Sequence, residues 1–247
     1  MMNLKNLEKL HRSVRSDVEQ YAHRLISTLG DGIKSIAVYG SSTGEDYVVG
    51  RSNVNLVVVV ETLTAATLAS LLKVVELGRR RRIVPPLLVT PDYLKASADV
   101  FPIEYLEIRD SQVVIFGDDF FTGIQTSREN LRLECESQLR AAVLRTRQAY
   151  LELGGRKRGA EQVLHASVTA LVPVFRAMLR LKGGEPPRSK VGVVQAMGAA
   201  FGINSETFAA ILRDKAGDEK IDGKAAITVL GTYIDEVDAL ARRLDQV

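Results

Sequence analysis

The chain has 247 residues, of which 46% are hydrophobic and 26% charged, a composition typical of a soluble globular protein with one large or two ordinary domains. Its formal net charge of +3 is too small to indicate a nucleic-acid partner. Cys135 is the only cysteine, which excludes an intramolecular disulfide and a thiolate metal cluster. We therefore expect a protein of a reducing compartment.

The beginning of the chain is too polar for a secretory signal peptide. We also expect no apolar run to reach the length that spans a membrane. The sequence therefore predicts a cytoplasmic protein with no membrane partner.

The first half of the chain mixes helical and strand patterns. Residues 4–29 carry apolar side chains at helical spacing, and the turn residues Gly30-Asp31-Gly32 follow them. A strand at 36–39, a polar loop and a strongly apolar strand at 54–60 come next, and a helix is predicted at 64–77. The remaining elements predicted in this half are an edge strand within 83–89, a helix at 91–97, and strands at 103–108 and 112–116 joined by a connection at 109–111.

Four consecutive arginines, Arg79–Arg82, follow the predicted helix at 64–77. A basic run at this place complements the helix dipole and faces solvent. The same run could instead contact phosphate or nucleic acid. One short run favours the solvated corner, and we expect no nucleic-acid partner.

Helical spacing dominates the second half of the chain. The predicted helices lie at 127–154, 160–181 with a kink at Pro173, 189–201 with Ser189 as N-cap, from Asn204 or Ser205 to 215, and from the charged turn 217–223 to the C-terminus. Short connections between them predict an antiparallel bundle. The sequence thus predicts an α+β protein, with a mixed sheet flanked by helices at 1–126 and an all-α helical bundle at 127–247.

A motif in the first half carries a family resemblance. Gly40-Ser41, eleven residues, and then Asn53-Val54-Asn55-Leu56 follow one another between the first two predicted strands. This pattern resembles the nucleotidyltransferase superfamily that includes DNA polymerase beta. Within that superfamily it is most similar to the minimal and kanamycin-type nucleotidyltransferases. The resemblance implies a mixed-sheet domain that cradles a nucleoside triphosphate, and it implies as nucleotide-binding residues Gly40, Ser41, Ser42, Arg51, Ser52, Asn53 and Asn55.

The family has aspartates where this chain has Asn53 and Asn55. Residues two apart on a strand point to one side of the sheet, so the family's carboxylates hold two Mg²⁺ ions against the triphosphate. Asparagine keeps the shape of aspartate without its charge, and Mg²⁺ binds mainly through carboxylates, phosphates and water. The resemblance also implies a third carboxylate on a nearby strand. Glu104 is the candidate, and Glu107, expected on the opposite strand face, is the fallback.

Three functional interpretations remain open. In the first, the chain is a nucleotidyltransferase-like protein that has lost catalysis and acts as a nucleotide-binding or regulatory module. In the second, it is an active Mg²⁺-dependent enzyme that uses Glu104 to transfer a nucleoside monophosphate to an unknown acceptor. In the third, it is a toxin–antitoxin-like protein that acts through its helical domain. The amides at Asn53 and Asn55 favour the first over the second, although both could equally bond loop backbone at the strand start.

A second resemblance concerns the helical half. Bundles that follow minimal nucleotidyltransferases often resemble the HEPN family, whose ribonucleases use an arginine and a histidine separated by four to six residues. Arg158 and His165 fit this spacing, but Gly159 stands where the family has a polar residue. The sequence therefore favours a helix-start arginine and a packed or surface histidine. The long helices leave a homodimer open.

Overall fold

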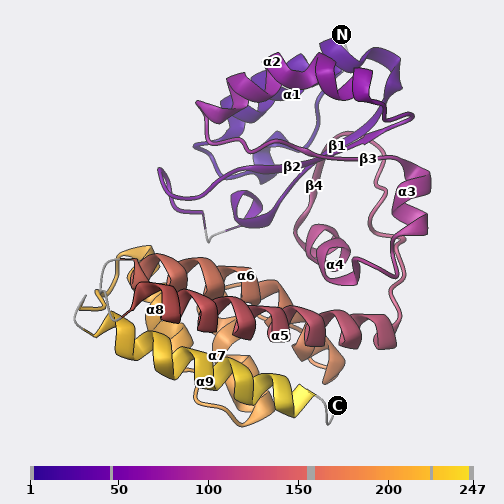
Figure 1. Ribbon diagram of the computed structural model, residues 1–247. Helices are drawn as coiled ribbons and strands as arrows, with labels where there is room; N and C mark the ends of the chain where they lie inside the picture. Colours follow the sequence, from indigo (N-terminus) through magenta and orange to yellow (C-terminus); the bar gives the residue numbers. More distant parts are fainter. Residues whose placement is uncertain (1–2, 45–46, 155–158, 223–224, 245–247) are drawn as a thin grey trace. The chain divides into compact units, whose positions relative to one another are not determined.

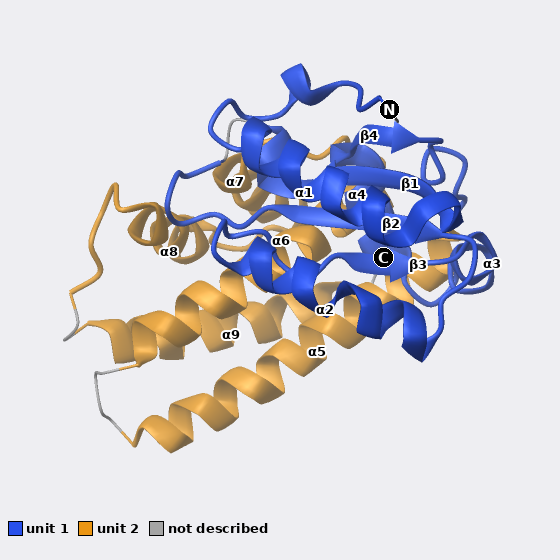
Figure 2. Ribbon diagram, turned by 90° about the horizontal axis from the view of Figure 1, so that it is seen from above, with its two compact units in different colours: residues 1–125 blue, residues 126–247 orange. Residues whose placement is uncertain are grey.

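The computed structural model describes residues 3–44, 47–154, 159–222 and 225–244. The chain divides into two compact units, Met1–Gln125 and Thr126–Val247 (Figure 2). Each unit has its own buried core.

Four strands of unit 1 form one mixed sheet in the order β3-β2-β1-β4 (Figure 1). Their bounds are Ile33–Tyr39 for β1, Asn55–Val60 for β2, Leu87–Val89 for β3 and Val113–Gly117 for β4. β1 is antiparallel to both β2 and β4, whereas β2 and β3 are parallel. In the β1–β2 ladder Tyr39 stands opposite Asn55.

Helices cover both faces of this sheet. They are α1 (Arg15–Leu29), α2 (Ala65–Arg79), α3 (Pro91–Ala96) and α4 (Pro102–Ser111). Side chains alternate between the faces along β2, so Leu56, Val58 and Val60 join a core with α1 and α2. Val57 and Val59 pack on the other face with residues of α3 and α4. Burial on both faces explains why β2 is a continuous apolar run.

The strand predicted at 103–108 is wrong, because this segment is the helix α4. The apolar run is too short for its period to separate strand from helix, and buried residues occupy three- and four-residue spacings within it. Pro102 stands at the helix start, where its fixed φ is favourable. Arg109, Asp110 and Ser111 accordingly belong to the end of α4 and not to a connection between strands.

The long N-terminal helix is shorter than predicted. The α-helix begins only at Arg15, after a single 3₁₀ turn at Leu7–Lys9. Before that turn Lys5 donates its backbone N–H to the carbonyl of Ile115, and Asn6 donates its side-chain Nδ2 to the carbonyl of Val114. These bonds to the edge of the sheet replace helical hydrogen bonds, so tertiary contacts override the local pattern.

Unit 2 is a helical bundle, as predicted. Its helices are α5 (Arg128–Leu153), α6 (Ala160–Leu181), α7 (Lys190–Phe201), α8 (Glu206–Ala216) and α9 (Ala226–Leu244). Ser189 caps α7 by accepting the backbone N–H of Gly192, which confirms that N-cap. At the start of α8 the side chain of Asn204, and not that of Ser205, accepts a backbone N–H. α6 stays helical through Pro173.

α6 is long and apolar enough to cross a membrane by length and composition alone, so the expectation that no apolar run reaches this length is wrong. Half of its apolar window is buried within the structure. α5, α7, α8 and α9 all contact it, and this is the environment of the core helix in a bundle.

The end of β4 offers a test of the sheet. Gly117 has φ +69°, and a Cβ there would overlap the carbonyl of Lys34 on β1. We expect Gly117→Ala to lower the free energy of unfolding by about 3 kcal/mol, measured by urea denaturation.

Two matched variants separate strain from overlap. Gly30 also has positive φ but open space around its Cβ, so Gly30→Ala should cost about 1 kcal/mol. Gly123 has neither constraint, and its alanine variant should be within about 0.5 kcal/mol of the parent. Equal costs at Gly117 and Gly30 would contradict this packing.

Cys135 in α5 offers a test of the bundle. Its side chain is fully buried, and burial raises the pKa of the thiol to about 12. The thiol is therefore protonated and shielded near neutral pH, and the native protein should not react with Ellman's reagent on the minute timescale. Reaction should become complete in denaturing guanidinium chloride. Rapid stoichiometric labelling in native buffer would show that the bundle opens easily.

Candidate functional site

β1 ends in the tight 3₁₀ turn η3 (Gly40–Thr43), which contains the Gly-Ser pair of the motif. Gly40 has φ +80°, a conformation that glycine adopts without strain. A Cβ on Gly40 would lie 3.1 Å from Nδ2 of Asn55. Both the backbone and the nearby amide therefore favour glycine, and the turn brings two predicted site residues together.

Ser111 at the end of α4 fixes this turn. Its Oγ accepts the backbone N–H of Gly40 at 3.0 Å and donates to the carbonyl of Glu107 at 2.6 Å. Thr43 Oγ1 lies 2.7 Å from the carbonyl oxygens of both Gly40 and Ser111, and its one hydrogen serves the two. We call this set of bonds the Ser111 latch. No pattern in the sequence indicates these bonds, because residues 109–111 are predicted from the sequence as a connection between two strands.

The two asparagines differ in their surroundings. Asn55 is the first residue of β2 and is half-buried, and it shares a sheet face with Tyr39, its cross-strand partner. Asn53 is exposed and lies before β2, separated from it by Val54, which forms an isolated bridge to Ile83. The placement of both asparagines on one regular strand is thus correct for Asn55 only.

Glu104 comes to this site from a helix instead of a strand. The pKa of Tyr39 is raised, first by burial of the phenol and then by the nearby carboxylate of Glu104. Since Tyr39 and Asn55 share a face, Glu104 approaches the side of the sheet on which Asn55 lies. Glu107 is three residues further along α4, so the two lie on neighbouring positions of one helix surface and not on opposite strand faces.

The other predicted residues line the loop between β1 and β2. Ser41 is half-buried, and its carbonyl accepts the N–H of Gly44. Ser42 is fully buried, its carbonyl accepts the N–H of His11, and its hydroxyl has no partner in the described part of the chain. Ser52 closes a turn, because its Oγ accepts the N–H of Val48, while Arg51 is exposed. Glu45 and Asp46, in the same loop, lie outside the described residues.

The residues of this site do not fit a two-magnesium centre. Asn53 and Asn55 supply neutral amides, and the carboxylate of Glu104 lies near Tyr39, the cross-strand partner of Asn55. Over the described ranges no group of three His, Cys, Asp or Glu side chains could hold a metal ion. Mg²⁺ requires carboxylates or ligand phosphates in addition to water, so the described residues of this site, with Glu104 as their predicted carboxylate, bind it weakly by themselves.

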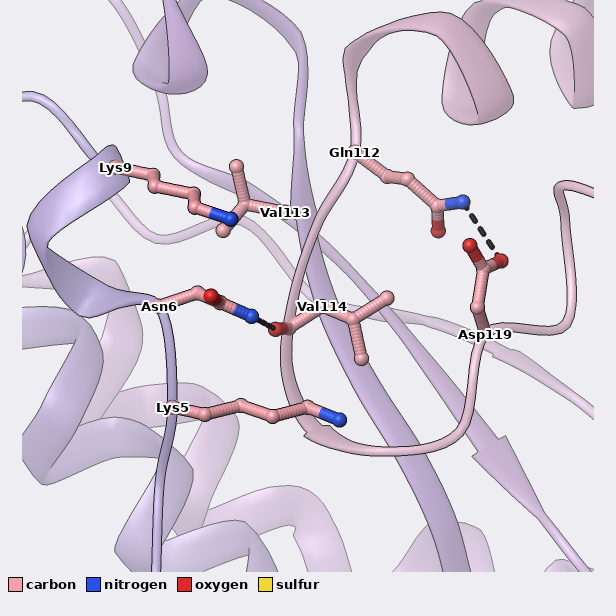
Figure 3. A pocket seen from close by; sticks show the side chains of 7 residues that line it. All are labelled: Lys5, Asn6, Lys9, Gln112, Val113, Val114 and Asp119. Carbon is pink, nitrogen blue, oxygen red and sulfur yellow. Dashed lines mark hydrogen bonds between the residues drawn. The ribbon is translucent and has the colours of Figure 1, made fainter.

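A cavity of about 260 Å³ lies at the edge of the sheet beside β4 (Figure 3). Lys5, Asn6, Lys9, Gln112, Val113, Val114 and Asp119 line it, and none belongs to the predicted site. Its polar groups largely bond one another: Asn6 donates to the carbonyl of Val114, and Gln112 Nε2 donates to Asp119 at 2.8 Å. Burial opposes ionisation of Asp119, but hydrogen bonds from Thr122, Phe121 and Gln112 hold its pKa below the usual value. The residues that line the cavity therefore form a hydrogen-bonded part of the sheet edge.

The pair considered for a ribonuclease falls only partly within the described residues. Arg158 lies outside the described residues. His165 on α6 has its Nε2 2.5 Å from Oδ2 of Asp214 on α8, and the other oxygen of Asp214 accepts the N–H of Ile221. His165 thus links two helices of unit 2, in agreement with a packed histidine.

The comparison with solved structures shows the fold. The structure of spectinomycin adenyltransferase AAD(9) from Enterococcus faecialis with ATP and spectinomycin is similar, with a TM-score of 0.58 and 12% sequence identity, over 89% of this chain and 99% of that one. The fold is nucleotidyltransferase-like. No family model matches the chain, and no curated protein matches it in sequence. At this identity the likeness concerns the nucleotidyltransferase-like fold alone, and the roles of individual residues stay predictions.

The Ser111 latch can be tested directly. Ser111→Ala removes the acceptor of the Gly40 N–H, and we expect the free energy of unfolding to fall by about 1–2 kcal/mol, because a half-buried donor loses its partner. The amide of Gly40 should also exchange its hydrogen faster, which NMR detects. Ser111→Thr keeps the hydroxyl and should restore most of the protection. Unchanged exchange at Gly40 in Ser111→Ala would show that the bond does not hold the turn.

Proposed function

We propose that unit 1 is a nucleotide-binding module that has lost metal-dependent nucleotidyl transfer. The observation that carries this proposal is the contrast within one site. The family resemblance implies a triphosphate cradle at the Gly40 turn and the start of β2, and the positive φ of Gly40 supports it. Asn53 and Asn55 stand where the family has the carboxylates that hold metal. The similar fold of a protein whose structure contains ATP supports a nucleoside triphosphate as the ligand class.

The loss of charge determines what kind of binding remains. Two aspartates would bring two negative charges that two Mg²⁺ ions neutralise, whereas two asparagines leave Glu104 as the predicted carboxylate among the described residues of the site. Without bridging metal ions, a triphosphate would still form hydrogen bonds with the backbone and the hydroxyl groups of the Gly40 turn. These bonds contribute only modestly to the free energy of binding. A dissociation constant of about 1 mM, or about −4 kcal/mol, is the expected range. Such binding suits a regulatory or interaction module better than a catalyst.

The second candidate is an active Mg²⁺-dependent transferase. The observation that favours it is the place of Glu104 on α4, where its carboxylate lies near Tyr39, the cross-strand partner of Asn55. In this reading the triphosphate itself supplies most metal ligands and Glu104 supplies the remaining carboxylate. The cytoplasmic location, a homodimer and a role for the helical unit as in toxin–antitoxin proteins stay predictions.

Isothermal titration calorimetry with ATP, GTP, CTP and UTP, with and without Mg²⁺, tests the proposal. The parent protein should bind at least one nucleotide weakly, with an affinity that Mg²⁺ changes less than about twofold. The variant Asn53→Asp/Asn55→Asp should bind at least about tenfold more tightly with Mg²⁺ than without it, because the carboxylates restore the metal ligands.

Asn204→Asp is the control for added negative charge, because Asn204 lies in unit 2 and its side chain accepts the N–H of Glu206 at the start of α8. It should leave nucleotide binding unchanged. Transfer of label from [α-³²P]nucleotide to any acceptor by the parent protein, lost in Glu104→Gln, would replace the proposal by the second candidate. Absence of all nucleotide binding in both the parent and the double variant would refute a nucleotide site.

A further inference from the structure

The helix α2 is apolar on two sides, but the described residues of the chain cover only one of them. Nine of its fifteen residues are alanine, leucine or valine. Leu71 and Val74 are buried in the core that α2 shares with α1 and the sheet (Figure 1). A surface helix normally carries polar residues on its outer side, and a helix that is apolar all round is normally buried all round. The composition of α2 therefore indicates a second packing partner.

The uncovered side of α2 carries a continuous apolar stripe. Its members are exposed and occupy positions i, i+3, i+4 and i+7, so they lie on one side of the helix: Ala65, Leu68, Ala69 and Leu72. Leu68 is 48% exposed and Leu72 is 68% exposed. The exposed residues of the neighbouring helix α1, by contrast, are all polar. We call the four residues the α2 stripe.

The α2 stripe is complementary to a second copy of itself. In an antiparallel pair of helices related by a twofold axis, Leu68 of one copy lies opposite the partner's Leu72, and the reverse contact follows by symmetry. Ala65 and Ala69 are small, so they leave grooves into which the leucine side chains of the other helix can pack. One surface patch thus supplies both sides of the contact.

Opposite charges stand at the two ends of the stripe. Glu61 precedes the N-cap Thr64 by three residues, and Arg79 is the last residue of α2. Both are exposed, and their ion pairs within the chain, with Lys34 at 3.2 Å and Glu76 at 3.6 Å, are surface pairs that contribute little. An antiparallel second copy brings each Arg79 to the partner's Glu61. A parallel copy would bring like charges together at both ends.

We propose that the α2 stripe is the contact surface for a second copy of this chain, whose own α2 packs against it in antiparallel orientation. Leu68 and Leu72 supply the apolar contact, and Glu61 and Arg79 select the orientation. The dimer is formed by unit 1 of each copy and does not require the long helices of unit 2.

The size of the stripe sets the strength of this association. A helix of fifteen residues is about 22 Å long, so one pair of such helices buries less than the roughly 1,200 Å² of a stable interface. The dimer is therefore weak and reversible, with a dissociation constant of about 10–100 μM.

Sedimentation equilibrium of the full chain, over concentrations from about 1 μM to about 1 mM, tests the proposal. The parent protein should show a reversible equilibrium between monomer and dimer. Leu72→Glu should weaken the association at least about tenfold, because it places a charge in the apolar contact.

Leu144→Glu in α5 is the matched control, since Leu144 is 67% exposed and lies in unit 2. It should change the dissociation constant less than about 1.5-fold. Both leucines are exposed, so both variants should keep the urea midpoint of the parent. This comparison separates the loss of a contact from a loss of folding.

Glu61→Arg and Arg79→Glu test the orientation. Each variant alone places like charges at both ends of an antiparallel pair, so each should associate at least about threefold more weakly than the parent. An equimolar mixture of the two variants brings opposite charges together again at both ends, and should associate about as tightly as the parent. Any strain that a substitution causes within its own chain persists in the mixture, so restored association reports the contact between copies.

Three results would overturn the proposal. One is a parent protein that stays monomeric up to about 1 mM. Another is a dimer that Leu144→Glu weakens as much as Leu72→Glu does, which would move the contact away from α2. The third is unchanged association of both charge variants, since a parallel pair only exchanges one contact between like charges for another. None of these results bears on the nucleotide titrations, because the stripe contains no residue of the candidate nucleotide site.

Discussion

The candidate site depends on how the end of β1 is held. Gly40 turns the chain with a positive φ, and its N–H is tied to Ser111 at the end of α4. β1 lies between two antiparallel neighbours with both faces buried, so the position of its last residue is determined by the whole sheet. The Ser111 latch ties the turn that follows β1 to the end of α4, the helix that carries Glu104. Precise placement of this kind is useful for recognition even where no metal binds.

The proposed site combines a tight glycine turn with two neutral amides. The positive φ of Gly40 in the turn η3 is a feature of backbone geometry. The amides of Asn53 and Asn55 instead determine the electrostatics of the site, and these two properties respond to different physical terms. Backbone geometry depends on sterics and hydrogen bonds, whereas metal affinity depends on the number of carboxylates. A fold can therefore lose one and keep the other, and the likeness to an adenyltransferase at 12% identity is compatible with either outcome.

Most of the architecture could be predicted from local pattern. The helices of unit 2, the apolar strand β2 and the cap at Ser189 follow from periodicity and from the chemistry of helix starts. Two segments were predicted wrongly from local pattern, for different reasons. The run in α4 was too short for its period to be decisive. The first residues of the chain follow a helical pattern, but Lys5 and Asn6 bond the edge of β4 instead. A contact more than one hundred residues away in sequence leaves no local signal.

The sequence by itself determined which chemical groups are present: the Gly-Ser turn, the two asparagines in place of carboxylates, and the run of four arginines. Only the tertiary structure decided which of them meet. It moved Glu104 from a strand to a helix while keeping it near Tyr39, and it closed the turn with Ser111, which no pattern had marked. It also tied one arginine of the run, Arg81, to Gln20 and Asp17 of α1. The reason is that local spacing governs secondary structure, whereas a site forms from side chains that distant backbone packing brings together.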